Sequence, residues 1–317
     1  MTTPLVSIIM SCFNETDKEL KSSIESILYQ SFRNFEFIIV NDNPQNDRLK
    51  NTLKSYKLDD IRVKIINNET NIGLAKSLNK ALALSIGKYI ARMDADDISY
   101  PNRLEKQIKY LESNPNCDLV ATNRDDIDED SNIIKKSAAI VVNDEVIPKI
   151  LKYGSIITHP SVMIKAESIK ELNGYRAFKS SQDYDLWLRM VNLNFHFHIM
   201  PDVLIKYRIR KNSITKSNYA RSYFCLKYIR ELFLERGKNN CIDSFSEDSL
   251  NIISNLPSYK TEPINQQYKQ ILALNQNKLQ PLFILKLLFG LITNKDCFIN
   301  FKNMLMVKLL IRKYKSR

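Results

Sequence analysis

The sequence predicts an α/β fold, with a mostly parallel sheet and flanking helices, followed by a helical, basic C-terminal segment. Within the first hundred residues, short β-branched runs alternate with segments of helical periodicity, and the connections between them are short. The chain of 317 residues is 44% hydrophobic and 26% charged, a balance that excludes a disordered or collagen-like protein. No uncharged apolar run reaches the roughly 18–20 residues that a membrane-spanning helix needs.

The first hundred residues supply the parallel part of the predicted sheet. Buried strands are expected at Leu5–Met10, Phe35–Val40, Val63–Ile66 and Gly87–Met93. The helices expected between them are Leu20–Tyr29, Asp47–Tyr56 and Leu74–Leu84. Because strands and helices alternate in this way, the helices should cross over the sheet and neighbouring strands should run parallel.

The next hundred residues continue the same domain less regularly. Helices are expected at Pro101–Glu112 and Tyr184–Asn192. Strands are expected at Leu119–Thr122, Ile156–Ile164 and Phe195–Met200, and the polar, acidic residues 124–136 indicate a loop or hairpin. Beyond Asn212, residues 218–236 and 264–317 have a helical pattern, while residues 238–262 are rich in Asn and Ser. We therefore expect one domain over residues 1–215 and a helical, basic region over residues 216–317.

The charge is divided unevenly between these two regions. The net charge of +12 comes from 47 basic and 35 acidic side chains. Residues 1–203 hold 26 basic and 28 acidic side chains, whereas residues 204–317 hold 21 and 7. The last third therefore carries the entire excess of positive charge.

The cysteines and the N-terminus both indicate a cytosolic protein. The five cysteines are odd in number, lie far apart and lack metal-ligand spacing, so they are expected to be free and mostly packed thiols. The N-terminus lacks the basic stretch and long apolar core of a signal peptide.

Polar side chains follow all four predicted parallel strands, at Ser11–Glu15, Asn41–Pro44, Asn67–Gly73 and Asp94–Asp97. Parallel α/β sheets bind ligands at the carboxyl ends of their strands. Any one of these loops could simply form a turn or a helix cap. Four together at one edge favour a polar binding site.

The run Asp94-Ala95-Asp96-Asp97 predicts a metal site. Three carboxylates within four residues repel one another, and a bound Mg²⁺ or Mn²⁺ would remove that repulsion while sharing its sphere with substrate phosphates. The alternative is that Asp96 or Asp97 caps the helix near Pro101. No GxxxxGK[ST] stretch occurs, which disfavours a P-loop nucleotidase.

The segment Ser181–Arg189 predicts a second functional group. Asp183 at the start of a helix could act as a general base, and Trp187 could offer a flat face on which a sugar ring stacks. The alternative is that Asp183 caps the helix and Trp187 belongs to the core. His159 is a further candidate, although a lone histidine is more often structural. The absence of HExxH, CxxC and GxSxG motifs leaves zinc and serine hydrolases without support.

Six pieces of the sequence follow one another in this order: VSIIMSCFNE, FIIVNDN, NIGLAKSLNKAL, GKYIARMDADD, HPSVMI and SQDYDLWLRM. Together they resemble family 2 inverting glycosyltransferases of the GT-A fold. The likeness runs from about residue 4 to residue 215. It is strongest to bacterial enzymes that extend lipid-linked oligosaccharides for O antigen, capsule or exopolysaccharide. The resemblance implies a Rossmann-like sheet, a nucleotide-binding half over residues 1–100 and an acceptor-binding half over residues 101–215.

The resemblance also implies a nucleotide site. The loop that contains Ser11, Phe13 and Glu15 lies where relatives hold the uracil and ribose. Asp42 lies where a carboxylate accepts a hydrogen bond from the uracil N3–H. The remaining nucleotide-sugar contacts are expected from Gly73, Lys76, Arg92 and Asp94, with Lys76 near the phosphates.

For the chemistry, the resemblance implies that Asp94 and Asp96 form a DXD motif that binds Mn²⁺ or Mg²⁺, with Asp96 as the more direct ligand. Asp183 matches the catalytic base. The neighbouring Gln182 replaces the usual Glu, and Arg210 replaces a histidine that can approach the metal or diphosphate in many relatives. Arg210 cannot ligate a metal but could pair with a diphosphate. The expected acceptor contacts are His159, Gln182, Trp187 and Arg210.

The expected reaction moves a hexose or N-acetylhexosamine, with galactose or glucose favoured, from a UDP-sugar to a polyprenyl-diphosphate-linked saccharide. A single displacement would form a β-glycosidic bond. The basic segments 282–292 and 297–314 indicate an amphipathic helix on the inner leaflet of the membrane, which predicts a peripheral protein on the cytoplasmic face of the bacterial inner membrane. The alternative is a helix packed on the catalytic domain.

Two other functions remain as alternatives at this point. A sugar nucleotidyltransferase also uses a metal and an α/β sheet, but it usually carries a Gly-rich phosphate loop near the N-terminus, which this chain lacks. A basic protein could bind nucleic acid. Here the basic residues are interleaved with Leu, Ile, Met and Phe, and no RRM, KH or zinc-finger signature is present, so no nucleic-acid partner is expected.

Overall fold

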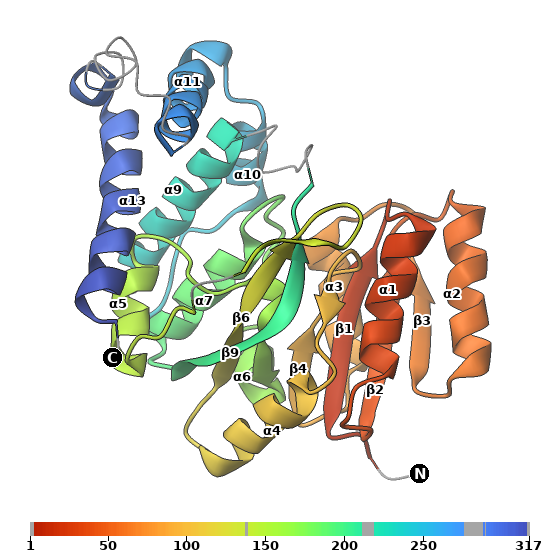
Figure 1. The fold of residues 1–317 in the computed structure, drawn as a ribbon. Helices are drawn as coiled ribbons and strands as arrows, with labels where there is room; N and C mark the ends of the chain where they lie inside the picture. The colour runs from red at the N-terminus through yellow and green to blue at the C-terminus, as the bar shows by residue number, and fades with distance from the viewer. Residues whose placement is uncertain (1–2, 137–138, 211–218, 276–287, 289, 316–317) are drawn as a thin grey trace.

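A computed structural model describes residues 3–136, 139–210, 219–275, 288 and 290–315 (Figure 1). These residues form a nine-stranded sheet in the order β3-β2-β1-β4-β8-β6-β9-β5, with β7 paired beside β6. Helices flank the sheet, and the C-terminal helices gather at one side of it (Figure 1). The predicted fold class, an α/β fold with a helical C-terminal part, is confirmed.

The N-terminal half contains the parallel strands that the sequence predicts. They are β1 (Val6–Cys12), β2 (Phe35–Asn41), β3 (Val63–Asn67) and β4 (Tyr89–Arg92). β1 pairs in parallel with β2 and β4, and β2 pairs in parallel with β3. Almost every residue of β1 and β2 is buried, because helices cover both faces of a parallel sheet and favour continuous apolar runs.

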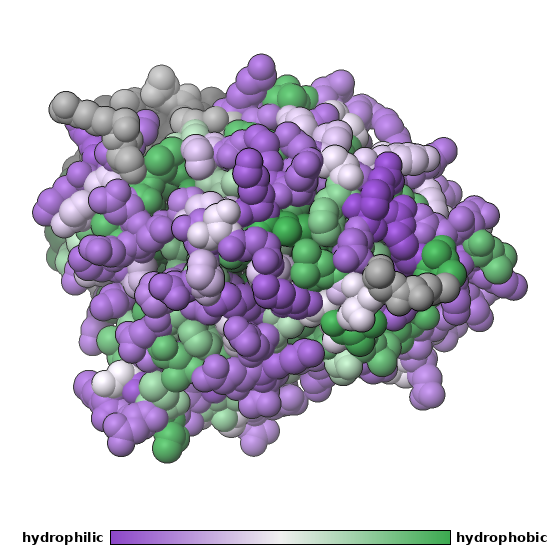
Figure 2. Space-filling view, turned by 90° about the horizontal axis from the view of Figure 1, so that it is seen from below, coloured by the Kyte–Doolittle hydropathy of each residue, from purple (hydrophilic) through white to green (hydrophobic). Residues whose placement is uncertain are grey.

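Two apolar clusters, one on each face of the sheet, form the core. The first includes buried side chains of α1 (Asp17–Leu28), α2 (Asp47–Asp59) and α4 (Arg103–Ser113). The second includes side chains of α3 (Leu74–Leu84), α5 (Ile147–Leu151), α6 (Ala166–Glu171) and α7 (Gln182–Asn192). On the face seen in Figure 2, hydrophilic residues surround small hydrophobic patches, as expected when the larger apolar surfaces are inside.

The second half of the sheet is mixed. Its strands are β5 (Ile98–Ser99), β6 (Leu119–Ile127), β7 (Ile133–Lys135), β8 (Met163–Lys165) and β9 (Phe197–Arg208). β8 runs antiparallel to β4 and β6, whereas β6 and β9 run parallel. The sheet is therefore parallel only in its N-terminal part, from β3 to β4, and across the β6–β9 pair.

Strands β6 and β9 are longer than the sequence predicts. We expected the first to end at Thr122 because polar residues follow it. These polar groups are bonded inside the protein: the Asn123 amide donates to the Met200 carbonyl at 2.8 Å, and the Tyr100 hydroxyl donates to the Asp125 carboxylate at 2.9 Å. Paired polar side chains can be buried at little cost, so the strand continues into a hairpin with β7.

The strand expected over Ile156–Ile164 is wrong for most of its length. Only Met163–Lys165 forms a strand, and a 3₁₀ turn covers His159–Ser161. Pro160 explains the difference, because it cannot donate a ladder hydrogen bond. The preceding residues instead form a loop beside the sheet.

The C-terminal part contains α9 (Tyr219–Arg236), α10 (Glu247–Ser254), α11 (Ser258–Asn275) and α13 (Lys295–Lys313). Helix α10 and the start of α11 lie within the Asn/Ser-rich residues 238–262, for which the sequence predicts no element. Asn and Ser supply caps here as well as turns: the Ser246 hydroxyl accepts from the Ser249 N–H at the start of α10.

Part of the basic segment 282–292 lies outside the described residues, as do residues 211–218 at the predicted domain boundary. The division at residue 215 therefore stays a prediction. Among the helices that are described, none combines the length and the apolar character needed to cross a membrane.

Candidate active site

The polar loops after β1, β2 and β3 meet at one edge of the sheet, as the sequence predicts. The Asn43 amide ties the loop after β2 to the loop after β1, through Phe13 O and Asn14 Oδ1, and the Asp42 carboxylate ties it to the loop after β3. Its Oδ1 accepts from the Asn68 side-chain amide at 2.7 Å and from the Ile72 N–H at 2.9 Å, and its Oδ2 accepts from the Gly73 N–H at 2.9 Å. Gly73 has φ +83°, which a side chain would disfavour, and it leads directly into α3. Asp42 thus fixes the loop before this helix.

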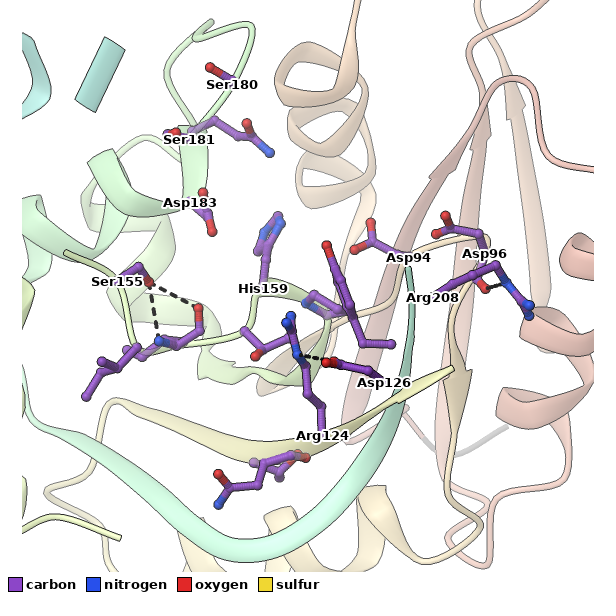
Figure 3. Close-up of a pocket in the computed structure, with 18 of the residues that line it drawn as sticks. Asp94, Asp96, Arg124, Asp126, Ser155, His159, Ser180, Ser181, Asp183 and Arg208 are labelled. Atoms are coloured by element: carbon purple, nitrogen blue, oxygen red, sulfur yellow. Dashed lines mark hydrogen bonds and ion pairs between the residues drawn. The ribbon is translucent and has the colours of Figure 1, made fainter. Parts of the chain in front are cut away.

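A cavity of about 840 Å³ opens beside these loops (Figure 3). Its volume suits a ligand of substantial size. Of the candidate site residues, those that line the cavity are Glu15, Asp94, Asp96, His159, Gln182, Asp183 and Arg210. Those that do not line it are Ser11, Phe13, Asp42, Gly73, Lys76, Arg92 and Trp187. The structure therefore brings the predicted metal ligands and the predicted general base into one cavity. Ser11, Phe13 and Asp42, which are predicted to contact the uracil and ribose, lie outside it.

Arginines contact Asp94 and Asp96, the two predicted metal ligands. The buried Arg92 donates from Nη2 to Asp94 Oδ1, while its Nε and Nη1 have no hydrogen-bond partner among the described residues. Arg210 places Nε 3.0 Å from Asp96 Oδ2 and Nη2 3.3 Å from Glu19 Oε1. Burial, together with the charge of Asp94, raises the pKa of Asp96 to about 6. The carboxylates are thus crowded, and the guanidinium groups partly offset their repulsion.

Asp97 has a structural role in the same loop. It does not cap α4, because the N-cap residue of that helix is Asn102. Instead its Oδ1 accepts from the Arg208 N–H at 2.7 Å. Arg208 is buried and donates in turn to the Asp96 carbonyl at 2.7 Å and to the turn between β6 and β7. These bonds fix the acidic loop against the end of β9.

Asp183 lies on the side of the cavity opposite Asp94 (Figure 3). Asp183 is the second residue of α7. The N-cap residue of this helix, Ser181, has a left-handed φ of +62°. Burial against the protein is the main cause that raises the pKa of Asp183 to about 6, and the charge of Asp94 adds to it. A carboxylate with this pKa is ionised at neutral pH and more basic than an exposed aspartate, as a general base requires.

His159 lines the cavity as a neutral group. Its Nε2 lies 2.9 Å from the Tyr175 hydroxyl, and its ring meets Tyr175 edge-on. Burial, followed by the nearby Arg92 charge, lowers the pKa of His159 well below its usual value. The imidazole therefore offers hydrogen bonding rather than charge.

The prediction that Trp187 forms a stacking platform is wrong. Its side chain is 0% exposed and belongs to the apolar cluster that contains α7. Asp183 and Trp187 share one face of α7, which meets the cavity in its first turn and the apolar core one turn later. The alternative interpretation, a core tryptophan, is the correct one. Gln182, which precedes Asp183 in α7, does line the cavity.

The expected nucleotide residues lie along the edge of the sheet beside the cavity. Phe13 is exposed at 39%, and its N–H donates to Glu15 Oε2 at 2.7 Å. Burial raises the pKa of Glu15. Lys76 is also exposed and lies 3.6 Å from Glu247 of α10. The exposed Phe13 and Lys76 are thus accessible to a ligand.

The comparisons with known proteins agree with this geometry. Residues 7–172, more than half of the chain, match the family described as Glycosyl transferase family 2. The chain belongs to this family. An uncharacterized glycosyltransferase of Methanocaldococcus jannaschii is 42% identical over 231 residues, which cover 72% of this chain and 80% of the relative. The O-antigen biosynthesis glycosyltransferase WbnJ of Escherichia coli is 37% identical over 235 residues, which cover 73% of this chain and 90% of WbnJ.

A solved structure confirms the GT-A fold of this family 2 glycosyltransferase. The crystal structure of S. aureus TarS 1–349 in complex with UDP aligns with a TM-score of 0.55 at 16% identity, covering 97% of this chain and 91% of TarS. Family membership also decides between the alternatives, because it favours transfer of a glycosyl group over synthesis of a nucleotide-sugar.

The donor atoms of the site suit a hard divalent cation. Glu15, Asp94 and Asp96 supply carboxylate oxygens to the same cavity, and Mg²⁺ and Mn²⁺ prefer such ligands. Within the described residues, no group of three His, Cys, Asp or Glu side chains is arranged to hold a metal ion. The cavity thus supplies ligand atoms of the right kind for such a cation, without a complete set of protein ligands among the described residues.

Several cavity residues were not predicted from the sequence of this glycosyltransferase. They include Arg124 and Asp126 of β6, Lys179, Arg208, and Val307 and Ile311 of α13. The Arg124 guanidinium stacks 3.8 Å from the Tyr207 ring centre and lies 3.1 Å from Asp126. No local motif marks these residues, since only the tertiary fold brings β6, β9 and α13 to one cavity.

Proposed function

We propose that this glycosyltransferase transfers a hexose or N-acetylhexosamine, with galactose or glucose favoured, from a UDP-sugar to a polyprenyl-diphosphate-linked saccharide. The product would be a β-glycosidic bond in a bacterial surface polysaccharide such as O antigen. One observation carries the proposal: Asp183, a carboxylate with a raised pKa, lies across one cavity from the Asp94 and Asp96 pair. A base and a diphosphate-binding pair on opposite sides of a cavity suit an in-line displacement.

The donor side is proposed to bind UDP. TarS, a protein of the same fold, has been crystallised with UDP and with UDP-GlcNAc. From the described residues Asp42 Oδ2 accepts only the Gly73 N–H, so that oxygen could also accept from the uracil N3–H. The exposed Phe13 and Lys76 flank the same edge and could contact the base and the phosphates.

Asp94 and Asp96 would hold a Mn²⁺ or Mg²⁺ ion, which would neutralise the negative charge that develops on the leaving UDP. Arg210 lies against Asp96 and could contact the same diphosphate once nucleotide binds. Arg92, two of whose nitrogens have no hydrogen-bond partner in the described part of the chain, keeps Asp94 oriented.

Asp183 is proposed to remove the proton from the acceptor hydroxyl. That hydroxyl would attack the anomeric carbon from the side opposite the diphosphate, and the bond to the UDP oxygen would break as the new bond forms. A single displacement converts an α-linked donor into a β-linked product. Neutral His159 and Gln182 line the same side of the cavity and could orient the acceptor by hydrogen bonds.

The proposed place of action is the cytoplasmic face of the bacterial inner membrane, where the protein would be peripheral. The similarity to WbnJ, an O-antigen biosynthesis glycosyltransferase, supports a lipid-linked acceptor. The basic helix α13 supports contact with the anionic inner leaflet.

The test is a screen of UDP-sugars against a synthetic polyprenyl-diphosphate N-acetylhexosamine with Mn²⁺ present. We expect UDP release with one or two donors and a product whose new linkage is β by NMR. An α-linked product, or release of UDP that is unchanged in the Asp183→Asn variant, would contradict the proposal.

A further inference from the structure

Helix α13 separates the active-site cavity from the surface of the molecule. Its inner face packs on the core through Val307, Leu310, Ile311 and Tyr314, and two of these residues, Val307 and Ile311, also line the cavity. The helix lies close to the loop after α5, since a Cβ on Gly154 would be only 3.2 Å from Val307 Cγ2. Part of the wall of the cavity is therefore apolar and comes from the C-terminal helix.

The outer face of α13 has a different composition. Phe298, Leu305 and Leu309 are 52%, 45% and 48% exposed. The basic side chains on the same exposed side are Lys302, Lys308, Arg312 and Lys313. Positions 298, 302, 305, 309 and 312 follow the three- and four-residue spacing of one helical stripe. We call these seven residues the outer stripe.

The outer stripe has no opposite charge to satisfy it. No acidic residue occurs between residues 302 and 315, and none of its four cations forms an ion pair with a described residue. The outer stripe therefore exposes three large apolar side chains in one row, among cations that pair with no described residue. That combination matches an anionic bilayer, where the apolar groups enter the headgroup region and the cations meet the lipid phosphates.

We infer that α13 lies on an anionic membrane through its outer stripe and that the acceptor reaches the cavity along its inner face. This inference rests on the proposed lipid-linked acceptor. A helix with its side chains is about 10–12 Å across, so the cavity wall would stand about one helix diameter above the headgroups. A saccharide on a membrane-anchored diphosphate could then reach Asp183 while its lipid stays in the bilayer.

The first test measures membrane binding without any substrate. The variant Lys302→Glu/Lys308→Glu/Arg312→Glu reverses three exposed charges of the outer stripe. The matched control, Lys50→Glu/Lys54→Glu/Lys57→Glu, reverses three exposed lysines of α2 and changes the net charge equally. In flotation with phosphatidylcholine vesicles containing phosphatidylglycerol, we expect the outer-stripe variant to lose at least about tenfold in partitioning. The control and the wild type should float equally, and pure phosphatidylcholine should bind both weakly.

The second test separates membrane delivery from chemistry. With a long polyprenyl-diphosphate acceptor in vesicles, the outer-stripe variant should lose activity by a factor similar to its loss of binding. With a short, water-soluble acceptor it should keep the wild-type rate, because the cavity is unchanged. The near-isosteric Val307→Thr change on the inner face should raise KM for the long acceptor only, with the UDP-sugar KM unchanged.

Equal flotation of the outer-stripe variant and the wild type would overturn the inference, as would an equal loss in the α2 control. If the outer stripe instead binds a second copy of the chain, the wild type would be a dimer and the outer-stripe variant a monomer that still binds vesicles. That result would also overturn the inference. Failure of the proposed function is distinguishable: the wild type would then bind vesicles through the stripe and yet transfer no sugar from any UDP-sugar.

Discussion

The two sides of the cavity are built differently. The donor side uses the consecutive strand ends of β1 to β4, where the Asp42 carboxylate accepts three hydrogen bonds from the loop after β3 and the Asn43 amide donates to the loop after β1. The opposite side combines β6, the loop before His159, the start of α7 and one face of α13, which lie far apart in the sequence. The first side is a fixed edge of a parallel sheet, whereas the second depends on the packing of separate segments. We expect substitutions of residues in the middle of the cavity to change the rate of the reaction. Substitutions on the second side should change how well the acceptor is used.

Asp183→Asn should produce the largest effect, because it keeps the shape of the acceptor side and removes only the base. Transfer should fall by about 10²–10⁴-fold, the range typical of a lost general base. UDP affinity, measured by calorimetry in Mn²⁺, should stay within about twofold, since Asp183 does not belong to the donor edge. Weakened UDP binding with substantial remaining turnover would place Asp183 on the donor side instead.

Asp96→Ala tests the donor side directly. Loss of one of the two proposed ligands should weaken Mn²⁺-dependent UDP binding and reduce transfer by about 10²-fold, because charge on the leaving diphosphate is less well neutralised. Chelation with EDTA should have the same effect on the wild type, and added Mn²⁺ should restore it. Full activity in EDTA would mean that Arg92 and Arg210 supply the positive charge without a metal.

The pH profile tests whether the raised pKa of Asp183 belongs to the working base. Burial raises this pKa to about 6, so the carboxylate is ionised above that value and protonated below it. A base must be ionised to accept a proton, and kcat should therefore fall as the pH drops through about 6, by about tenfold for each further unit. The residual activity of the Asp183→Asn variant should not show this fall of kcat at low pH. If the fall persists in the variant, it belongs to the titration of another group.

These two sides also differ in how far the sequence predicts them. Strand ends and loops that follow one another along a parallel sheet must meet at one edge, so Asp42, Asp94 and Asp96 could be predicted from spacing alone. Trp187 could not, because its burial depends on which face of α7 packs inward. Val307 and Ile311 are apolar residues in a basic helix, and only the tertiary position of α13 makes them part of the cavity.

Arg210 joins the two sides, and its substitution should have the smallest effect. In this structure it lies between Asp96 and Glu19, where its positive charge competes with any cation bound at Asp96. Arg210→Ala should therefore tighten Mn²⁺ binding in the absence of nucleotide by about two- to fivefold, the range expected for a partly exposed ion pair. Titration of Mn²⁺ by electron paramagnetic resonance measures this change.

The matched control for Arg210 is Lys88→Ala, which removes an exposed ion pair with Glu112 at the end of β4 opposite Asp94. It should leave Mn²⁺ affinity unchanged. The Arg210→Ala variant should also bind UDP less tightly at saturating Mn²⁺ if the guanidinium contacts the diphosphate once nucleotide is bound. Tighter metal binding together with weaker UDP binding would show that one arginine neutralises the aspartate in the free protein and the diphosphate in the complex. Unchanged affinities for both would leave Arg210 as a structural ion pair that holds the end of β9 to α1.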